Sequence, residues 1–146
     1  MLSGEYNHNL DAKGRIILPS KLREEIGDTF YVTRYFESCL AVFSVEEFER
    51  LGKSMQSLPG NMRDVRRIQR VIITGAHLCE VDKQGRFVVP PQLRTHAGLE
   101  KELVIVGNGT HAEIWDSNRW NEYLYGDDSV SLEEAAEALN EAGLAF

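Results

Sequence analysis

Residues 11–23, DAKGRIILPSKLR, recur 71 positions later as residues 82–94, DKQGRFVVPPQLR. When the alignment is extended to Gly27 and Gly98, seven of its 17 positions are identical. Composition alone predicts roughly one identity in such a window. The chain of 146 residues therefore contains a duplicated unit, and each copy has to be interpreted together with the other.

Both copies predict the same order of elements, and that order gives an α+β fold. A strand leads into an Asp-x-x-Gly-Arg turn, and a second strand ends at Pro19 or Pro90, because proline cannot donate to a strand ladder. A short helix follows, and Gly27 and Gly98 are placed where a left-handed C-terminal cap belongs. The expected strands are residues 5–10, 16–18, 30–33 and 39–43 in the first copy and 77–81, 87–89, 103–106 and 111–115 in the second, with helices at 20–26 and 91–97.

Each copy closes with a helix that begins at a polar cap. Ser44 with Glu47 forms a capping-box pattern, and Asp116 is the cap of the second copy. We expect four segments: a first unit at 1–60, a basic connecting helix at 61–75, a second unit at 76–126, and an acidic C-terminal helix at 127–146. The last helix is expected to begin at Ser131, three residues before Glu134.

The connecting segment has an apolar stripe and an arginine face. Met62, Val65, Ile68 and Ile72 follow helical spacing on one side of residues 61–73. The opposite side carries the arginine face, defined as Arg63, Arg66, Arg67 and Arg70. This face fits a surface that tracks phosphates, and it fits a solvated helix face or a surface for an acidic partner equally well.

The net charge of −7 argues, by itself, against a nucleic-acid partner. Six acidic residues, however, lie in the segment 127–146, which has no Lys or Arg. The remaining 126 residues hold 17 of the 23 acidic side chains against all 16 basic ones. Because the acidic excess is concentrated in the tail, composition does not exclude DNA binding.

The Asp-x-x-Gly-Arg turn has the strongest chemical signal. An Asp side chain can accept hydrogen bonds from backbone amides two residues on, and Gly supplies a positive φ. Such a turn would aim Lys13, Arg15 and Arg86 outward from a rigid frame. Arginine suits phosphates and guanine edges because its planar fork has two parallel donors. The alternative is a hairpin in which Asp11 merely pairs with Arg15, but retention of Asp and Arg in both copies favours a functional turn.

Catalytic and metal-binding patterns are weak. His77-x-Cys79 is only half of a metal site, and neither Cys39 nor Cys79 has a nearby His that would activate a thiol. No Gly-rich phosphate loop is present. We therefore predict no enzyme activity, no metal and no cofactor. Phe43 and Trp115 are at equivalent positions of the repeat, as are Phe48 and Trp120, and Trp115, Trp120 and Phe43 are expected to be core residues.

The sequence also shows no pattern typical of a transmembrane segment or a secretory signal. Apolar runs such as residues 103–106 are too short to span a bilayer, and the opening residues 1–5 lack the features of a secretory signal. Two cysteines do not make a disulfide framework. We expect a cytoplasmic protein with no membrane partner.

The duplicated turn and its surroundings resemble the MraZ family of bacterial transcription regulators. The resemblance extends over nearly the whole chain, and two motif copies at this spacing are specific. A single copy would not separate this family from other AbrB-like proteins. Besides the two turns, the matching segments are Met1–Asn9, Arg66-Arg67-x-Gln69-Arg70, His96-Ala97-Gly98-Leu99 and Ile114-Trp115-Asp116.

The resemblance implies two AbrB-like β units packed as a pseudo-dimer within one chain, and assembly of several chains into a ring. It implies double-stranded DNA as the partner, with a target of short direct repeats in the promoter of the division and cell-wall gene cluster, and hence association with the nucleoid. The implied DNA-binding residues are Lys13, Arg15, Lys83 and Arg86, supported in the turns by Asp11, Gly14, Asp82 and Gly85. Gln84 replaces Lys13 in the second copy, which predicts unequal phosphate affinity.

Two rival functions remain at this point. An AbrB-like antitoxin would also bind DNA, but it usually has one unit followed by a disordered tail, whereas this chain has two units and a capped terminal helix. A non-DNA assembly module would fit the duplicated β units and the acidic balance. Absence of binding to any DNA fragment at low salt would favour that module.

Overall fold

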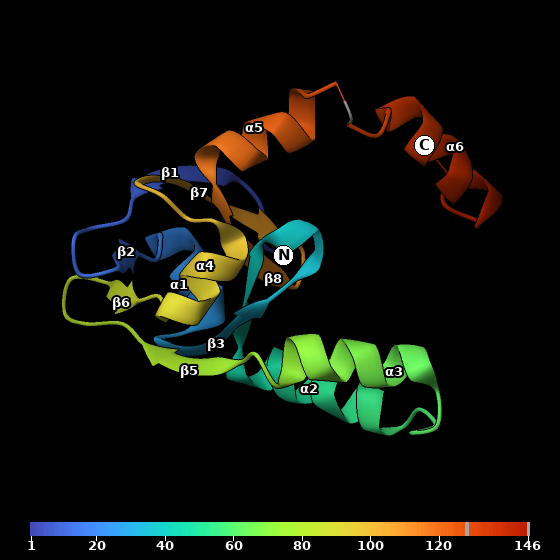
Figure 1. Ribbon diagram of the computed structural model, residues 1–146, viewed down its shortest axis with the longest axis horizontal. Helices are drawn as coiled ribbons and strands as arrows, with labels where there is room; N and C mark the ends of the chain where they lie inside the picture. Colours follow the sequence, from blue (N-terminus) through green and yellow to red (C-terminus); the bar gives the residue numbers. More distant parts are fainter. Residues whose placement is uncertain (128, 146) are drawn as a thin grey trace.

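Strands of both sequence copies form one six-stranded antiparallel sheet (Figure 1). The structure is a computed structural model, which describes residues 1–127 and 129–145. Asp128, one of the six acids of the tail, and Phe146 lie outside the described residues. In spatial order the strands are β1 (Glu5–Asn9), β7 (Glu102–Asn108), β8 (His111–Asp116), β4 (Leu40–Ser44), β3 (Thr29–Arg34) and β5 (His77–Glu80).

The outer strands of this sheet are exchanged between the copies. β1 of the first copy pairs with β7 of the second, so that Tyr6 lies opposite Ile105. β5 of the second copy pairs with β3 of the first, so that Cys79 lies opposite Phe30. β4 and β8 join the two halves at the centre. Each half of the sheet therefore depends on a strand of the other copy, which agrees with the predicted pseudo-dimer.

A second, two-stranded sheet joins the copies directly. β2 (Arg15–Ile17) pairs with β6 (Arg86–Val88), and Ile16 lies opposite Phe87. The strands on either side of each Asp-x-x-Gly-Arg turn thus pair with strands of other segments and not with one another. The turn therefore does not close a two-stranded hairpin, although the ion pair between Asp11 and Arg15 that this alternative supposed does form.

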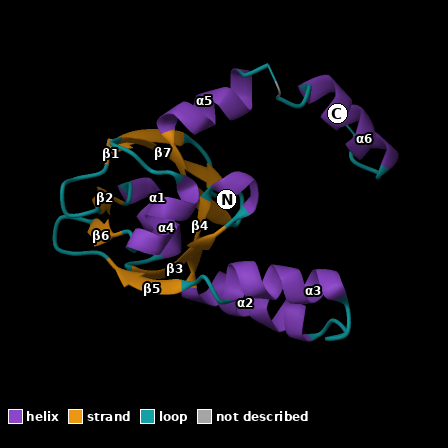
Figure 2. Ribbon diagram, in the orientation of Figure 1, coloured by secondary structure: helices purple, strands orange, loops and turns teal. Residues whose placement is uncertain are grey.

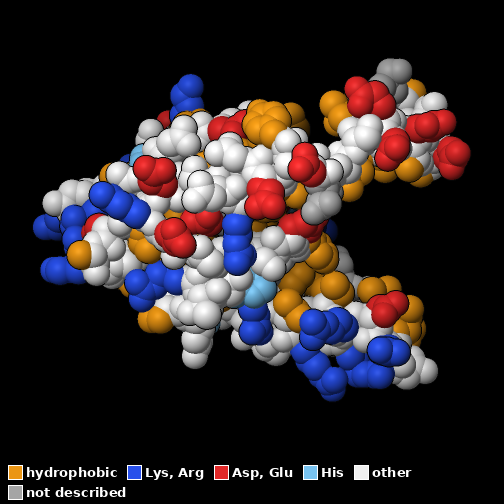
Figure 3. Space-filling view, turned by 45° about the horizontal axis from the view of Figure 1, so that its top comes forward, with side chains coloured by type: hydrophobic (Ala, Val, Ile, Leu, Met, Phe, Trp, Pro, Cys, Tyr) orange, Lys and Arg blue, Asp and Glu red, His pale blue; other side chains and the backbone are white. Residues whose placement is uncertain are grey.

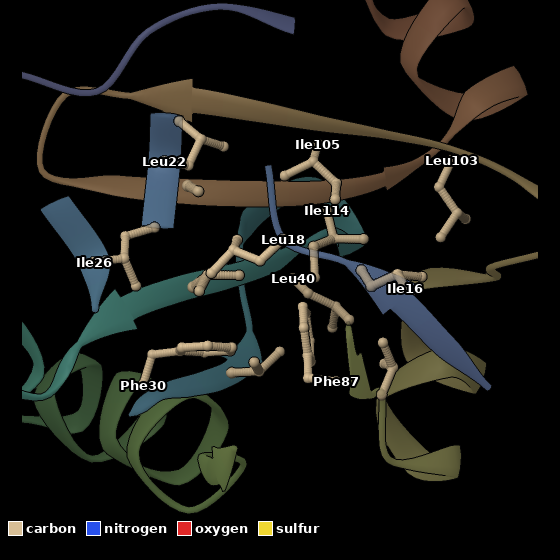
Figure 4. Close-up of a cluster of buried hydrophobic side chains, with 14 of the residues drawn as sticks. Ile16, Leu18, Leu22, Ile26, Phe30, Leu40, Phe87, Leu103, Ile105 and Ile114 are labelled. Carbon is tan, nitrogen blue, oxygen red and sulfur yellow. The ribbon is translucent and has the colours of Figure 1, made fainter. Parts of the chain in front are cut away.

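Two short helices, α1 (Ser20–Ile26) and α4 (Pro91–Ala97), follow the small sheet as predicted (Figure 2). Side chains from both copies form one core, in which Phe30 meets Phe87 edge to face at 4.9 Å between ring centroids (Figure 4). Leu18 and Leu22 of the first copy pack there with Leu103 and Ile105 of the second. Because this core requires both copies, we expect them to fold as one cooperative unit.

Most of the predicted caps form. Ser44 accepts a hydrogen bond from the Glu47 amide, and Asp116 accepts one from the Arg119 amide. Gly98 has the left-handed conformation expected of a C-terminal cap (φ 58°, ψ 35°). Gly27 differs, because its φ of 94° is combined with an extended ψ of 177° that turns the chain directly into β3.

The connecting segment forms an arm that projects from the sheet together with α2 (Val45–Gln56) (Figure 1). It begins as α3 (Arg63–Ile68) and continues as a π-helical turn, η2 (Gln69–Ile73). Two side chains of β3 donate hydrogen bonds to backbone carbonyls of this wider turn: Arg34 donates to the carbonyl of Val71, and Thr33 donates to that of Ile72. These contacts give a physical reason for the departure from α-helix.

The predicted apolar stripe of the arm is only partly buried. Val65 and Ile72 lie in the interior, whereas Met62 precedes the first helical turn and is 47% exposed. The prediction was wrong at Met62, because the helix begins one residue after it. The chain ends with α5 (Ser117–Tyr125) and α6 (Leu132–Glu141), and the Ser131 hydroxyl accepts a hydrogen bond from the Glu134 amide as predicted.

Candidate nucleic-acid interface

The first Asp-x-x-Gly-Arg turn is organised around the carboxylate of Asp11. One oxygen, Oδ1, accepts hydrogen bonds from the backbone amides of Lys13 at 2.9 Å and Arg15 at 2.8 Å. The other oxygen, Oδ2, receives the Nε–H of Arg15 at 2.7 Å. Gly14 closes the turn with a φ of 75°, a conformation that costs a side-chain-bearing residue energy. One carboxylate therefore fixes both the loop and its arginine.

The second turn repeats this geometry. Asp82 Oδ1 accepts from the amides of Gln84 and Arg86, both at 2.9 Å, and Asp82 Oδ2 receives Arg86 Nε at 2.8 Å. Gly85 has a φ of 76°. All eight turn residues predicted from the sequence thus belong to two equivalent loops, including the solvent-exposed Lys83.

Hydrogen bonds to backbone and side chain lower the pKa of both Asp carboxyls. For Asp11 the largest effect is the backbone hydrogen bond from Arg15, and for Asp82 it is the one from Arg86. Both carboxyls are therefore ionised near neutral pH, and each forms an ion pair with its arginine. In this state each arginine is held through Nε.

The terminal nitrogens distinguish the two turns. Within the described chain, no acceptor takes the Nη groups of Arg15, which leaves them for an external ligand. Arg86 donates one Nη to the Gln84 side chain at 2.8 Å. Gln84 occupies the position of Lys13, so the second turn replaces a cation by an internal hydrogen bond. The structure thus shows a difference in contacts between the two turns, and their unequal contribution to phosphate affinity stays a prediction.

The two turns lie side by side at one end of the molecule, at the left edge of Figure 1. Each is fastened to the strand of the other copy, because Gly14 O accepts from the Val89 amide and Gly85 O accepts from the Leu18 amide, both at 2.9 Å. Basic side chains gather at the same end of the surface (Figure 3). The pairing of β2 with β6 therefore produces one basic edge with two rigid loops.

Two further arginines, which the turn motif alone did not indicate, complete this edge. Arg94 of α4 lies over Gly14, so close that a Cβ on Gly14 would be 2.6 Å from its Nη1. Arg23 of α1 lies over Gly85 in the same way, at 2.5 Å. Each loop is thus covered by an arginine of the other copy. Arg23 and Arg94 occupy the same position in the two sequence copies, and this shared arginine was the sequence signal that could have indicated them.

The arginine face lies elsewhere. α3 is in the projecting arm, at the end of the molecule opposite the two turns (Figure 1). The structure therefore brings the turn residues together with Arg23 and Arg94, and it does not bring Arg63, Arg66, Arg67 and Arg70 to that edge.

The residues considered for catalysis are not activated. Burial raises the pKa of the Cys79 thiol to about 11, and burial also raises that of Cys39. Among residues 1–127 and 129–145, no three His, Cys, Asp or Glu side chains gather in a way that could hold a metal ion. In the same part of the chain, no helix is long and apolar enough to cross a bilayer.

Comparison with known families gives a match over nearly the entire chain. The family described as "MraZ protein, putative antitoxin-like" matches twice, at residues 1–71 and 72–142. The chain belongs to the MraZ family. The second match begins 71 residues after the first, which confirms the duplication found in the sequence.

Curated relatives support the same membership. Proteins named "Transcriptional regulator MraZ" are 45% identical in Lachnoclostridium phytofermentans, over 100% of both chains, and 43% identical in Thermoanaerobacter sp., over 99% of this chain and 100% of theirs. The corresponding protein of Heliobacterium modesticaldum is 46% identical over 95% of this chain and 96% of its own. The solution structure of PHS018 from Pyrococcus horikoshii aligns with 78% of this chain and 88% of its own at 17% identity, with a TM-score of 0.32, too low to bear on the fold.

Proposed function

We propose that this chain is a sequence-specific DNA-binding regulator of transcription. The observation that carries the proposal is the pair of equivalent, rigid Asp-x-x-Gly-Arg loops on one basic edge. The curated relatives carry the name of a transcriptional regulator, which supports the same function. Its partner is double-stranded DNA, and the site binds this partner without chemical conversion, so no catalytic residue or cofactor is assigned.

The loops bind by presenting preorganised donors. Arg15 and Arg86 are held through Nε, so the terminal nitrogens of Arg15 can donate in parallel to a guanine edge or a phosphate at little further entropic cost, while Arg86 shares one of its two with Gln84. Lys13 and Lys83 are exposed residues of the same turns and supply charge for phosphates. The acidic tail does not oppose this, because α6 is remote from the turns (Figure 3).

We expect Asp11→Ala to weaken specific binding, although it removes a negative charge near the phosphates. The carboxylate holds two backbone amides and Arg15, and its loss frees the loop. Titration of a labelled duplex measures the affinity. Glu24→Ala, which removes an exposed acid without a turn contact, is the matched control and should leave binding unchanged or slightly tighter. Tighter binding by Asp11→Ala would disprove the ordering role.

We expect Arg23→Ala with Arg94→Ala to weaken binding by about one to two orders of magnitude, because each guanidinium covers the loop of the other copy and adds positive charge beside it. The measurement is the affinity at two salt concentrations. Loss of phosphate contacts should also reduce the salt dependence of binding. Wild-type affinity together with a wild-type salt slope would remove these residues from the interface.

The target proposed for the chain is a set of short direct repeats in the promoter of the division and cell-wall gene cluster, bound by a ring of several chains in the nucleoid. One chain already contains both copies of its unit, so it needs no partner to complete the pair of loops. Further association can then run head to tail, which presents successive pairs of loops in one orientation. Direct repeats match that arrangement, whereas palindromes match a twofold dimer.

Selection of bound sequences from random DNA by the purified full-length chain tests this function. We expect enrichment of one short motif at physiological salt, and recovery of direct repeats of it when longer random regions are used. Retention of no DNA fragment even at low salt would overturn the proposal and favour a non-DNA assembly module.

A further inference from the structure

An aromatic pocket of about 650 Å³ lies on the face of the sheet that is turned away from the main core, between η1 (Phe36–Ser38) and α5. Ring centroids are 5.2 Å apart between Trp115 and Trp120 and between Trp115 and Tyr123. Tyr35 and Phe36 also line the pocket, with ring centroids 4.8 Å apart. Ring faces of this kind attract cations.

The acidic groups of the aromatic pocket have no cationic partner from Lys or Arg. Glu113 is 8% exposed, and its carboxylate is bonded to His111 at 2.9 Å and to Trp115 Nε1 at 3.0 Å. Glu5 accepts from Trp120 Nε1 at 2.7 Å, and Glu37 adds a third acid. Among residues 1–127 and 129–145, no Lys or Arg lines the pocket.

The charge state of Glu113 supports a negative pocket. Burial raises the pKa of the Glu113 carboxyl, but hydrogen bonds from His111, Trp115 and Asn108 outweigh burial and bring its pKa below the usual value. Burial and then the charge of Glu113 raise the pKa of the Tyr35 hydroxyl. The pocket is therefore lined by aromatic rings and by an ionised carboxylate. A guanidinium fits this environment, because it has flat apolar faces and a fork of donors.

The same chain carries the complementary group on its arginine face. No ion pair joins Arg63, Arg66, Arg67 or Arg70 to an acidic group of the described chain. The face lies on the arm that projects from the body, and no residue of α3 lines the pocket. In Figure 3 the basic surface of this arm and the acidic surface of α6 lie on separate projections, with hydrophobic side chains exposed between them.

We propose that the aromatic pocket receives guanidinium groups from the arginine face of a second copy of this chain. The contact is heterologous, because pocket and arginine face are different surfaces, and it can therefore repeat from copy to copy until a ring closes. This inference rests on the proposed function only in that an oligomer exists, and it assigns that oligomer its two contacting surfaces.

Charge-reversal complementation tests the contact in full-length protein without DNA. The arm variant is Arg63→Glu with Arg67→Glu, two exposed positions one helical turn apart. The pocket variant is Glu5→Lys with Glu37→Lys, also exposed. We expect the association constant of each variant, measured by sedimentation, to fall at least tenfold. A one-to-one mixture should regain oligomers, because the unchanged arm of one variant meets the unchanged pocket of the other and the two charge-reversed surfaces meet each other. Glu24→Lys with Glu80→Lys changes the same charge elsewhere and should assemble as the wild type does.

Wild-type assembly of either variant would overturn the inference, as would a mixture of folded variants that stays in single chains. Circular dichroism and melting temperature establish folding. Where loss of the Glu5–Trp120 hydrogen bond disturbs the pocket variant, Glu37→Lys alone gives the same test. Because no DNA is present, failure of DNA binding by the wild-type chain would leave this result unaffected, and the two failures are distinguishable.

Discussion

We expect Arg15→Ala combined with Arg86→Ala to abolish sequence-specific DNA binding while the melting temperature stays near that of the wild type. Each lost bidentate contact costs about 1–3 kcal/mol, so both together correspond to a loss of roughly thirtyfold to more than 10⁴-fold in affinity. Both ion pairs to Asp are at the surface, where such pairs contribute little to stability. The fold should therefore tolerate the change.

The measurement is affinity for the selected DNA and for an unrelated duplex, together with thermal unfolding. Arg50→Ala with Lys53→Ala is the matched control, because it removes two exposed cations of α2, far from the turns (Figure 1), and should keep sequence preference. Unchanged affinity in the arginine variant would refute its assignment. Loss of affinity together with the fold would mean that the turn arginines act structurally.

The single mutants should separate the two turns. Arg15 is free at both terminal nitrogens within the described chain, whereas Arg86 shares one with Gln84. We infer that Arg15 contributes the larger part of the loss. The sequence had already indicated this asymmetry, since Gln84 stands where Lys13 does in the first copy.

Local elements of the fold were predictable because their signals are local. Pro19 and Pro90 end strands, Ser44 and Asp116 start helices, and the strand and helix positions followed from short patterns that the structure confirms. Strand partners were not predictable in the same way. Alternation of residues in β1 says which face is buried, but it does not say that β1 pairs with β7 of the other copy.

In the candidate site, too, the features set by local sequence were predictable and those set by packing between the copies were not. The Asp-x-x-Gly-Arg spacing is enough to predict the hydrogen bonds of Asp11, because all partners lie within four residues. The placement of Arg94 over Gly14 depends on how α4 packs across the pseudo-dimer, which no local pattern contains. Similarly, the expected core role of the tryptophans is confirmed for buried Trp115, whereas Trp120 is partly exposed beside the aromatic pocket.

A second large effect is expected from the helical phase of the DNA site. Loops on successive chains of a head-to-tail ring face the DNA in one orientation, so repeats about 10 base pairs apart present themselves on the same side of the duplex. Engaging two repeats at once multiplies affinity by the effective concentration of the second site, worth about 10²–10⁴-fold. A single repeat should therefore bind poorly.

Insertion of about half a helical turn, roughly 5 base pairs, between two repeats should remove most of that gain, because the second repeat then faces away from the protein. Insertion of a full turn of about 10 base pairs returns the second repeat to the same side of the duplex and should reduce the affinity much less. The comparison uses oligomeric wild-type protein at physiological salt, with a single-repeat duplex as the reference for binding without avidity. Equal affinity for the two insertions would mean that chains do not engage successive repeats as one rigid assembly, and direct repeats would then no longer follow from head-to-tail association.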